Sequence, residues 1–233
     1  MKVTTDACLF GAWCAEIIQN EIPIAIGTSQ NALDIGSGTG LLSLMVAQKN
    51  NIKVDSIEID SAAAEQAKEN FSSSPWKDNL HVINDSLQHA THHHPDRYRD
   101  RSSNYQIIIS NPPFFNNDLK SPKDQRNLAL HSSELSLEEL FECVNVLLDA
   151  EGSFFLLLPY HRKEEAVQTA SLHKLYVQEE VNVKQTPKHN YFRTMLRLSR
   201  KDATENISEI IIKQNDAYTS AFVSLLKDYY LYL

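Results

Sequence analysis

The stretch Leu33-Asp34-Ile35-Gly36-Ser37-Gly38-Thr39-Gly40 carries the strongest indication of the fold, because a β-rich run there ends in three alternating glycines. A dinucleotide fingerprint would place its third glycine where Leu41 stands, and a Walker loop would end in Gly-Lys-Ser/Thr. The spacing therefore disfavours NAD and ATP. Glycines let the backbone turn sharply and approach a ligand closely, so we expect Gly36, Ser37, Gly38 and Gly40 to surround one. Asp34 can accept a hydrogen bond from a ligand ammonium, which suits the amino-acid end of S-adenosylmethionine.

Acidic residues also follow the next two predicted strands. Glu58 stands near the carboxyl end of the second strand, where an acid can accept both hydroxyls of a ribose, and Ile59 follows it. Asp85 and Ser86 follow the third strand, and Asp85 is placed to take the 6-amino group of the cofactor's adenine. One such acid alone is more typical of a helix cap or a turn. Their repetition at successive strand ends favours a cofactor site.

The segment Asn111-Pro112-Pro113-Phe114 follows a further apolar strand. Two prolines fix the backbone and remove two N–H donors, which leaves the neighbouring carbonyls free to accept hydrogen bonds. The side-chain oxygen of Asn111 and the carbonyl of Pro112 can then hold both hydrogens of a planar amine, and Phe114 can stack on its ring. The arrangement serves methyl transfer to a conjugated nitrogen, by positioning and electrostatics and without a covalent enzyme intermediate.

Short β-rich runs alternate with helix-like runs along the chain, which predicts an α/β fold with a mostly parallel sheet and helices on both faces. We expect one domain over residues 1–233. The expected strands are 31–35, 54–59, 80–84, 106–110, 153–158, 177–183 and 192–198. The expected helices are 6–20, 40–49, 62–71, 137–148, 163–172 and 218–230, with Asp6 and Ser61 at N-cap positions.

The net charge of -8 does not indicate nucleic-acid binding, so basic residues would have to gather locally. They do so in residues 181–201, which contain no acid. In strand 192–198 a period of two places Arg193, Met195 and Arg197 on one face and an apolar set on the core side. This basic face is either a solvated strand surface or a phosphate-contact patch.

The chain lacks an apolar run long enough to cross a bilayer and an apolar signal segment, so we expect a cytoplasmic protein without membrane contact. Its three cysteines fit no metal or redox spacing, and we expect reduced thiols. The cluster of His89 with residues 92–94 has poor geometry for a tetrahedral site, so we expect no metal.

At these residues the chain resembles class I S-adenosylmethionine-dependent methyltransferases with an Asn-Pro-Pro-Tyr/Phe motif. It resembles most closely the bacterial tRNA1(Val) adenine-37 N(6)-methyltransferase family, over nearly its whole length. The closer likeness rests on residues 1–6 and 9–13, on Ser74-Pro75-Trp76, and on tail residues 218–222 and 229–233.

This resemblance implies a Rossmann-like, seven-stranded sheet with a reversed hairpin at one edge. It implies S-adenosylmethionine as cofactor, with Thr5 and Asp6 near it, and a target adenine at residues 111–114. It implies that the partner is the anticodon loop of a tRNA, whose single strand lowers the cost of unstacking the base, and we expect a monomer. The expected RNA contacts are Phe115, Arg126, His131, Lys188, Arg193 and Arg197.

The chain departs from the family pattern at three places. Ala7 follows Thr5-Asp6 where the family has glycine, and Leu130 stands where the family has an arginine, a role we expect Arg126 to take. Family members usually have a further stretch before residue 1, and we expect its absence to weaken RNA or cofactor binding.

Other functions of Asn-Pro-Pro-aromatic proteins stay open from the sequence. They are methylation of another RNA, of DNA adenine or of a protein glutamine, and a cofactor-binding scaffold without turnover. The DNA and glutamine enzymes usually carry an additional domain, for which this chain leaves no room.

Overall fold

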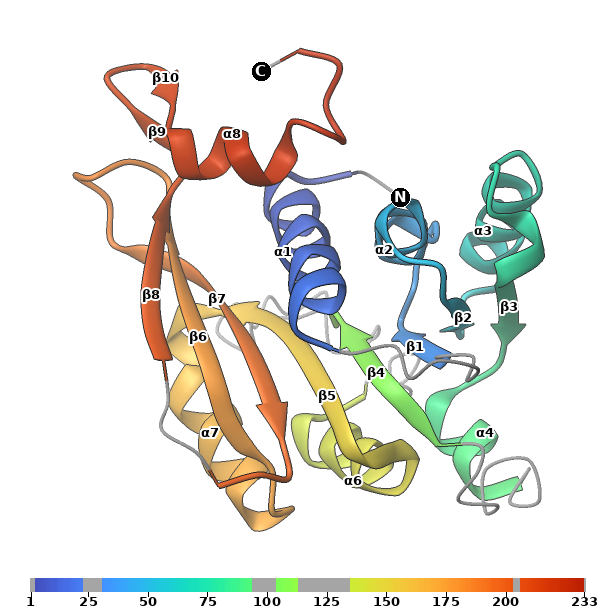
Figure 1. The fold of residues 1–233 in the computed structure, drawn as a ribbon. Coiled ribbons are helices and arrows are strands. Elements are labelled where there is room, and N and C mark those ends of the chain that lie inside the picture. Colours follow the sequence, from blue (N-terminus) through green and yellow to red (C-terminus); the bar gives the residue numbers. More distant parts are fainter. Residues whose placement is uncertain (1–2, 23–30, 94–103, 113–134, 203–205, 233) are drawn as a thin grey trace, which may run out of the picture.

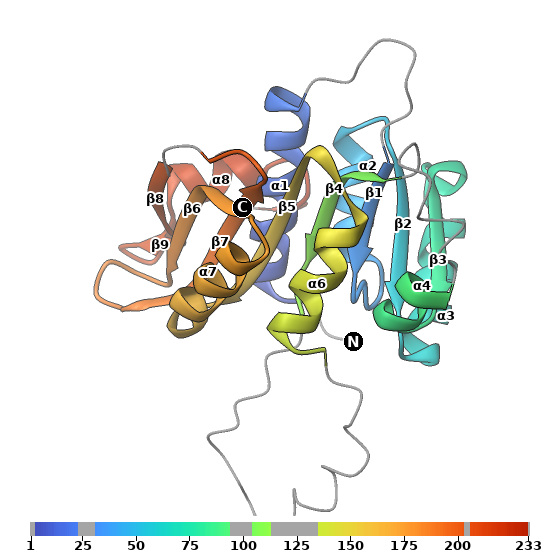
Figure 2. The same ribbon diagram turned by 90° about the horizontal axis from the view of Figure 1, so that it is seen from below.

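The computed structural model describes residues 3–22, 31–93, 104–112, 135–202 and 206–232, and these build a central eight-stranded sheet (Figure 1). The strand order is β3-β2-β1-β4-β5-β7-β6-β8, and Figure 2 shows β3 and β8 at opposite edges. The strands are β1 (Asn31–Ile35), β2 (Lys53–Glu58), β3 (Leu80–Asn84), β4 (Tyr105–Ser110), β5 (Leu148–Pro159), β6 (Tyr176–Lys184), β7 (Tyr191–Ser199) and β8 (Asn206–Ile211). A small hairpin of β9 (Lys213–Gln214) and β10 (Ala217–Tyr218) follows.

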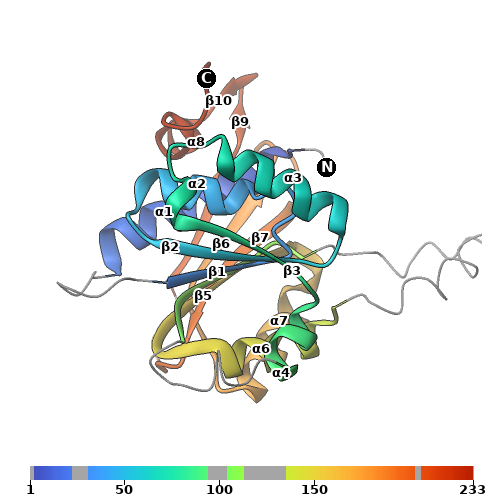
Figure 3. The ribbon, with the colours of Figure 1, turned by 90° about the vertical axis from the view of Figure 1, so that its right-hand side faces the viewer.

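Helices cover both faces of the sheet (Figure 3). One face packs against α1 (Thr5–Glu21), α2 (Leu41–Lys49), α3 (Ser61–Ser72) and α8 (Ser220–Leu226). The other packs against α4 (Leu87–His93), α6 (Leu137–Leu147) and α7 (Lys163–Leu172). Short 3₁₀ turns, η1 (Lys77–Asn79) and η4 (Tyr160–Arg162), precede β3 and follow β5. None of the helices in the described ranges is long and apolar enough to span a membrane.

The central strands β1, β4 and β5 are buried on both faces, and apolar side chains make up most of the two cores that flank them. In β4, Ile107 and Ile109 join the core under α1 and α2, whereas Ile108 between them joins the core under α6. The pairings of β1 with β2 and β4, of β2 with β3 and of β4 with β5 are parallel. Strand β7 is antiparallel to both β5 and β6, which makes the expected reversed hairpin at one edge.

The expectation of seven strands is wrong by one, because β8 pairs in parallel with β6 and extends that edge. Four of its six residues are exposed, so it lacks the apolar alternation by which a strand is recognised. The sequence analysis also did not predict helix α4, because its segment is mostly polar.

The expected N-caps are each shifted by one or two residues. Asp60 caps α3, accepting from the backbone N–H of Ala63 at 2.7 Å, and Ser61 is the first helical residue. Thr4, not Asp6, stands at the N-cap of α1. Asp6 lies in the first turn, where its carboxylate takes up other partners.

Candidate functional site

The polar residues expected to bind a cofactor gather where four parallel strands end. Ile35 of β1 lies beside Ile57 of β2 and beside Ser110 of β4. Glu58 at the end of β2 lies beside Asn84 at the end of β3. The carboxyl ends of these strands therefore share one edge of the sheet, as ligand sites of open parallel sheets do.

The glycine turn lies at this edge, between β1 and α2. Gly36, Gly38 and Gly40 have φ values of +68°, +57° and +80°, in the left-handed region that favours glycine. The backbone N–H groups of Gly36 and Ser37 donate to the Ile57 carbonyl at 2.9 and 3.1 Å, which anchors the turn to β2. A Cβ on Gly36 would meet no atom within 4 Å, so the space beside Gly36 is open.

Asp34 lies beneath this turn and is fully buried. Its Oδ2 accepts from the hydroxyl of Ser43 at 2.7 Å and from the Ser43 backbone N–H at 3.2 Å. The hydroxyl of Ser56 lies 2.7 Å from that of Ser43. Burial raises the pKa of Asp34 from 3.8 to about 6, the Ser43 hydrogen bonds oppose the rise, and the charge of Glu58 adds to it.

Two buried oxygens at this place have no hydrogen-bond partner among the described residues. They are Oδ1 of Asp34 and Oγ of Ser37. A buried polar atom without a partner costs about 1–3 kcal/mol, so unsatisfied oxygens in a native site call for an explanation. Both atoms belong to residues that the sequence places in the cofactor site.

Glu58 joins the glycine turn to the end of β2. It is 7% exposed, and its two carboxylate oxygens accept from the backbone N–H groups of Gly38 and Asp60, each at 2.8 Å. Ile59, the next residue, is 53% exposed, which makes it an uncovered apolar side chain at the same edge.

Asp85 and Ser86 lie next along this edge, after β3. The backbone N–H of Asp85 donates to the Glu58 carbonyl at 3.1 Å. The Asp85 carboxylate accepts from the Ser86 backbone N–H and lies against Nδ1 of His89, both at 2.7 Å. The sequence singled out His89 only as part of a histidine cluster and did not predict this pairing.

Asn111 and Pro112 continue directly from β4. The hydroxyl of Ser110 donates to the Ile35 carbonyl at 3.1 Å, which ties the end of β4 to the residue before the glycine turn. Asn111 is half-buried and Pro112 is buried. The remaining predicted residues in this part of the chain, Pro113, Phe114, Phe115, Arg126 and His131, lie outside the described residues.

The basic face of β7 is not the open surface that one reading of the sequence expected, because carboxylates of α1 pair with its two arginines, which are only partly exposed. Met195 is fully buried in the core that contains α1. Arg193 Nε lies 2.7 Å from Oδ2 of Asp6, in the first turn of α1. Arg197 Nη1 lies 2.5 Å from Glu21 and 2.8 Å from Glu179. Both arginines thus hold carboxylates of this chain.

Thr5 and Asp6 both stand in the first turn of α1, at its start. Lys188 is exposed in the turn between β6 and β7.

The sequence did not predict Ser43 and Ser56, whose hydroxyls lie next to Asp34. Ser43 is the third residue of helix α2, which follows Gly40. Its position in the first turn after the glycines could have indicated that its hydroxyl lies near Asp34.

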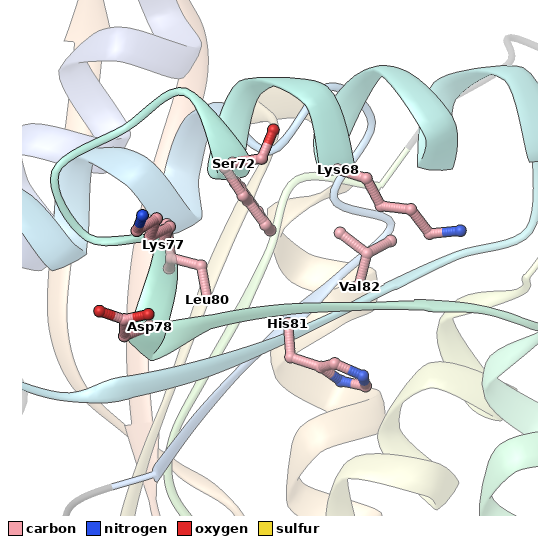
Figure 4. A pocket seen from close by; sticks show the side chains of 8 residues that line it. Lys68, Ser72, Lys77, Asp78, Leu80, His81 and Val82 are labelled. Atoms are coloured by element: carbon pink, nitrogen blue, oxygen red, sulfur yellow. The ribbon is translucent and has the colours of Figure 1, made fainter.

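A separate pocket lies between α3 and the edge strand β3 (Figure 4). It is lined by Lys68, Phe71, Ser72, Lys77, Asp78, Leu80, His81 and Val82. No predicted site residue lines it. No three histidine, cysteine or acidic side chains within the described ranges are grouped so that they could hold a metal ion.

Comparison with known proteins matches this chain to methyltransferases. The family model for the methyltransferase small domain matches residues 14–185. The tRNA1(Val) (adenine(37)-N6)-methyltransferase of Aliivibrio salmonicida is 37% identical over 99% of this chain and 91% of its own length. That of Pectobacterium carotovorum is 37% identical over 100% of this chain and 88% of its own. This chain belongs to the tRNA1(Val) (adenine(37)-N6)-methyltransferase family.

Solved structures with low sequence identity share the fold of this methyltransferase. A predicted O-methyltransferase from Agrobacterium tumefaciens superposes with a TM-score of 0.65 at 14% identity, covering 95% of each chain. A putative RNA methyltransferase from Pyrococcus horikoshii gives 0.54 at 16% identity, covering 81% of this chain and 82% of its own. The fold is therefore that of the Rossmann-like class I methyltransferases, and S-adenosylmethionine is the methyl donor.

Proposed function

We propose that this methyltransferase transfers a methyl group to the 6-amino nitrogen of adenine 37 in tRNA1(Val). The observation that carries the proposal is the position of Asn111-Pro112 at the end of β4, tied through Ser110 to the residue before the glycine turn. Relatives 37% identical over nearly the full length bear the corresponding name. We propose further that residues 1–233 act as one domain, as a monomer without a metal, in the cytoplasm.

The residues around the glycine turn fit S-adenosylmethionine, which supplies an electrophilic methyl group on a sulfonium. Oδ1 of Asp34 is a buried acceptor without a described partner, and we assign it to the ammonium of the methionine end. We assign Ser37 Oγ and the open space beside Gly36 to the remainder of the methionine end of the cofactor. Gly38 and Gly40 give the turn its shape.

The nucleoside end extends along the same edge of the sheet. We assign Glu58 to the ribose hydroxyls, Asp85 and Ser86 to the adenine, and the exposed Ile59 to one face of the base. Glu58 accepts from the Gly38 N–H through Oε2 and from the Asp60 N–H through Oε1, which fixes its carboxylate at the edge. Thr5 and Asp6 lie near the cofactor from the side of α1.

The target adenine is held by residues 111–114. The Asn111 side-chain oxygen and the Pro112 carbonyl accept the two hydrogens of the 6-amino group, which draws its lone pair out of conjugation with the ring. Phe114 stacks on the base, worth about 1–3 kcal/mol. The nitrogen is thereby positioned for in-line attack on the methyl group.

Phe115, Arg126, His131 and Lys188 are proposed to contact the tRNA. Arg193 and Arg197 stay in the proposal, but they would exchange Asp6, Glu21 and Glu179 for phosphates. Lys188, which is exposed, is the better placed cation.

Methyl transfer from labelled S-adenosylmethionine to three acceptors tests the substrate class. Unmodified tRNA1(Val), duplex DNA and a glutamine-containing release-factor peptide are incubated in parallel, and the products are digested and identified by mass spectrometry. We expect N(6)-methyladenosine from the tRNA alone. Label in DNA or peptide would overturn the substrate, and binding of the cofactor without any transfer would favour a scaffold.

A further inference from the structure

Strand β5 carries the chain past Asn111-Pro112 and into the short turn η4. Ser110, at the end of β4, lies beside Leu156 of β5. Strand β5 then continues for three more residues to Pro159, and Tyr160 follows as the first residue of η4. Tyr160 is therefore one strand away from Asn111-Pro112 and about two residues, or roughly 7 Å, farther toward the same edge of the sheet.

The hairpin of β6 and β7 brings a second tyrosine to this place. Pro159 pairs with Arg193 of β7, and β7 begins two residues earlier, at Tyr191. The ring centroids of Tyr160 and Tyr191 lie 5.0 Å apart, with an angle of 40° between the ring planes. Both tyrosines are partly exposed, so the pair presents aromatic surface at this edge of the sheet.

Two lysines and one carboxylate hold these rings. Lys184 Nζ lies 4.3 Å from the centre of the Tyr191 ring, within the range of a cation–π contact. Lys163 Nζ lies 5.3 Å from the centre of the Tyr160 ring. Glu209 accepts from the Tyr191 hydroxyl at 2.6 Å and from Lys184 at 3.0 Å. Side chains of β6, β8 and α7 therefore fix the pair before any ligand binds.

Single-stranded RNA is the ligand that this surface fits. Proteins bind unpaired bases by stacking them on aromatic rings, and basic groups beside the rings follow the phosphate backbone. Lys188 and His189 are exposed in the turn that joins β6 to β7, and His161 is exposed next to Tyr160. Two adjoining rings flanked by an exposed lysine and exposed imidazoles suit a nucleobase and its phosphate.

We propose that the Tyr160–Tyr191 pair binds the base next to the target adenine in the tRNA loop. That base stacks on the exposed surface of the pair while the adenine is held at Asn111-Pro112. The inference rests on the proposed function and adds to it a second base-binding site, made of two residues that the sequence did not single out. The rings are required at both positions, whereas their hydroxyls are not.

Steady-state kinetics of the full chain with tRNA1(Val) test the proposal. Tyr160→Leu and Tyr191→Leu each remove one ring, and we expect KM for the tRNA to rise about tenfold at saturating S-adenosylmethionine, as for one lost base–aromatic stack. Tyr160→Phe and Tyr191→Phe keep the rings and should stay within threefold of wild type. In all four variants the Kd for S-adenosylmethionine, measured by calorimetry, should change by less than twofold, because β4 separates β5 from the strand that leads into the glycine turn.

Tyr176→Leu is the matched control. Tyr176 is partly exposed as well, but it begins β6 and therefore lies at the opposite edge of the sheet. We expect its KM for the tRNA to stay within twofold of wild type. Urea unfolding of each variant reports stability separately.

Anticodon stem-loops with an abasic nucleotide on either side of the target adenine link the tyrosines to one base. If the neighbouring base stacks on the pair, its removal raises KM in wild type but adds little to the effect of Tyr160→Leu. A photoreactive base at the same position should crosslink to Tyr160 or Tyr191 of the wild-type protein, which tests the contact without any substitution.

An unchanged KM in both leucine variants, with adenine 37 methylated by wild type, overturns the inference and leaves the proposed function standing. Equal rises in Tyr160→Leu, Tyr191→Leu and Tyr176→Leu overturn it too, since the effect then follows general destabilisation. Additive losses from Tyr160→Leu and the abasic loops would place the neighbouring base elsewhere and also overturn it. Wild-type protein that does not methylate the tRNA overturns the proposed function together with the inference.

Discussion

Replacing Asp34 with asparagine removes a buried charge while keeping an oxygen that accepts from Ser43. In the wild-type protein, burial raises the pKa of this carboxyl from 3.8 to about 6. The folded state therefore binds the proton more tightly than the unfolded state does. Stability from this group is fully present below about pH 4 and is lost as the pH rises to about 6.

The size of the effect follows from the same two values. A rise from 3.8 to about 6 corresponds to about 3 kcal/mol of unfolding free energy. We therefore expect the unfolding free energy of wild type, minus that of Asp34→Asn, to fall by about 2.5 kcal/mol between pH 4 and pH 7, because part of the full effect is already lost at pH 4. This difference cancels whatever constant effect the amide nitrogen has on packing.

Urea unfolding of wild type and Asp34→Asn from pH 4 to pH 8, without cofactor, measures this difference in unfolding free energy. Calorimetric titration of S-adenosylmethionine over the same pH range should show the opposite pH dependence. Binding should strengthen as the pH rises, since the ionised carboxylate is the form that accepts a hydrogen bond from an ammonium. We expect the wild-type Kd for S-adenosylmethionine to rise as the pH falls below about 6, and Asp34→Asn to bind about tenfold to a hundredfold more weakly at pH 8. A stability difference that does not vary with pH would refute the reasoning about Asp34.

Three further outcomes are expected. Asn111→Ala should reduce methyl transfer more than a hundredfold while the Kd for S-adenosylmethionine, measured by calorimetry, changes less than threefold; lost cofactor binding would speak against its role at the target base. Gly40→Ala should lower the unfolding free energy by about 2–4 kcal/mol, because a Cβ there would clash with the ring of Phe71 at a left-handed φ. Gly36→Ala, which meets no such clash, should cost about 1–2 kcal/mol and weaken cofactor binding more than tenfold. Lys188→Ala should lower tRNA affinity and reduce its salt slope by about one, and an identical slope in filter-binding titrations would remove Lys188 from the RNA surface.

Several strands of the sheet were predictable from short runs rich in β-branched and apolar residues that end at polar or glycine residues. Strands β1 and β3 begin and end at the expected residues, and β4 differs by one. The convergence of Asp34, Glu58 and Asn111 at one edge follows from parallel pairing, which the alternation of strands and helices predicts.

The features that could not be predicted from the sequence depend on contacts between distant segments. Arg193 and Arg197 alternate as an exposed basic face would, and only the placement of α1 supplies Asp6 and Glu21 as their partners. Strand β8 is exposed along most of its length and forms because β6 offers a free edge.

Methylation of tRNA1(Val) that differs only at position 37 tests the central claim most directly. Unmodified transcripts with adenine or guanine at that position are incubated with the protein and labelled S-adenosylmethionine, and oligonucleotide fragments are mapped by mass spectrometry. The account predicts one methyl group on the 6-amino nitrogen of adenine 37 and no incorporation into the guanine transcript. Equal labelling of both transcripts, or a methyl group mapped to another nucleotide, would contradict it.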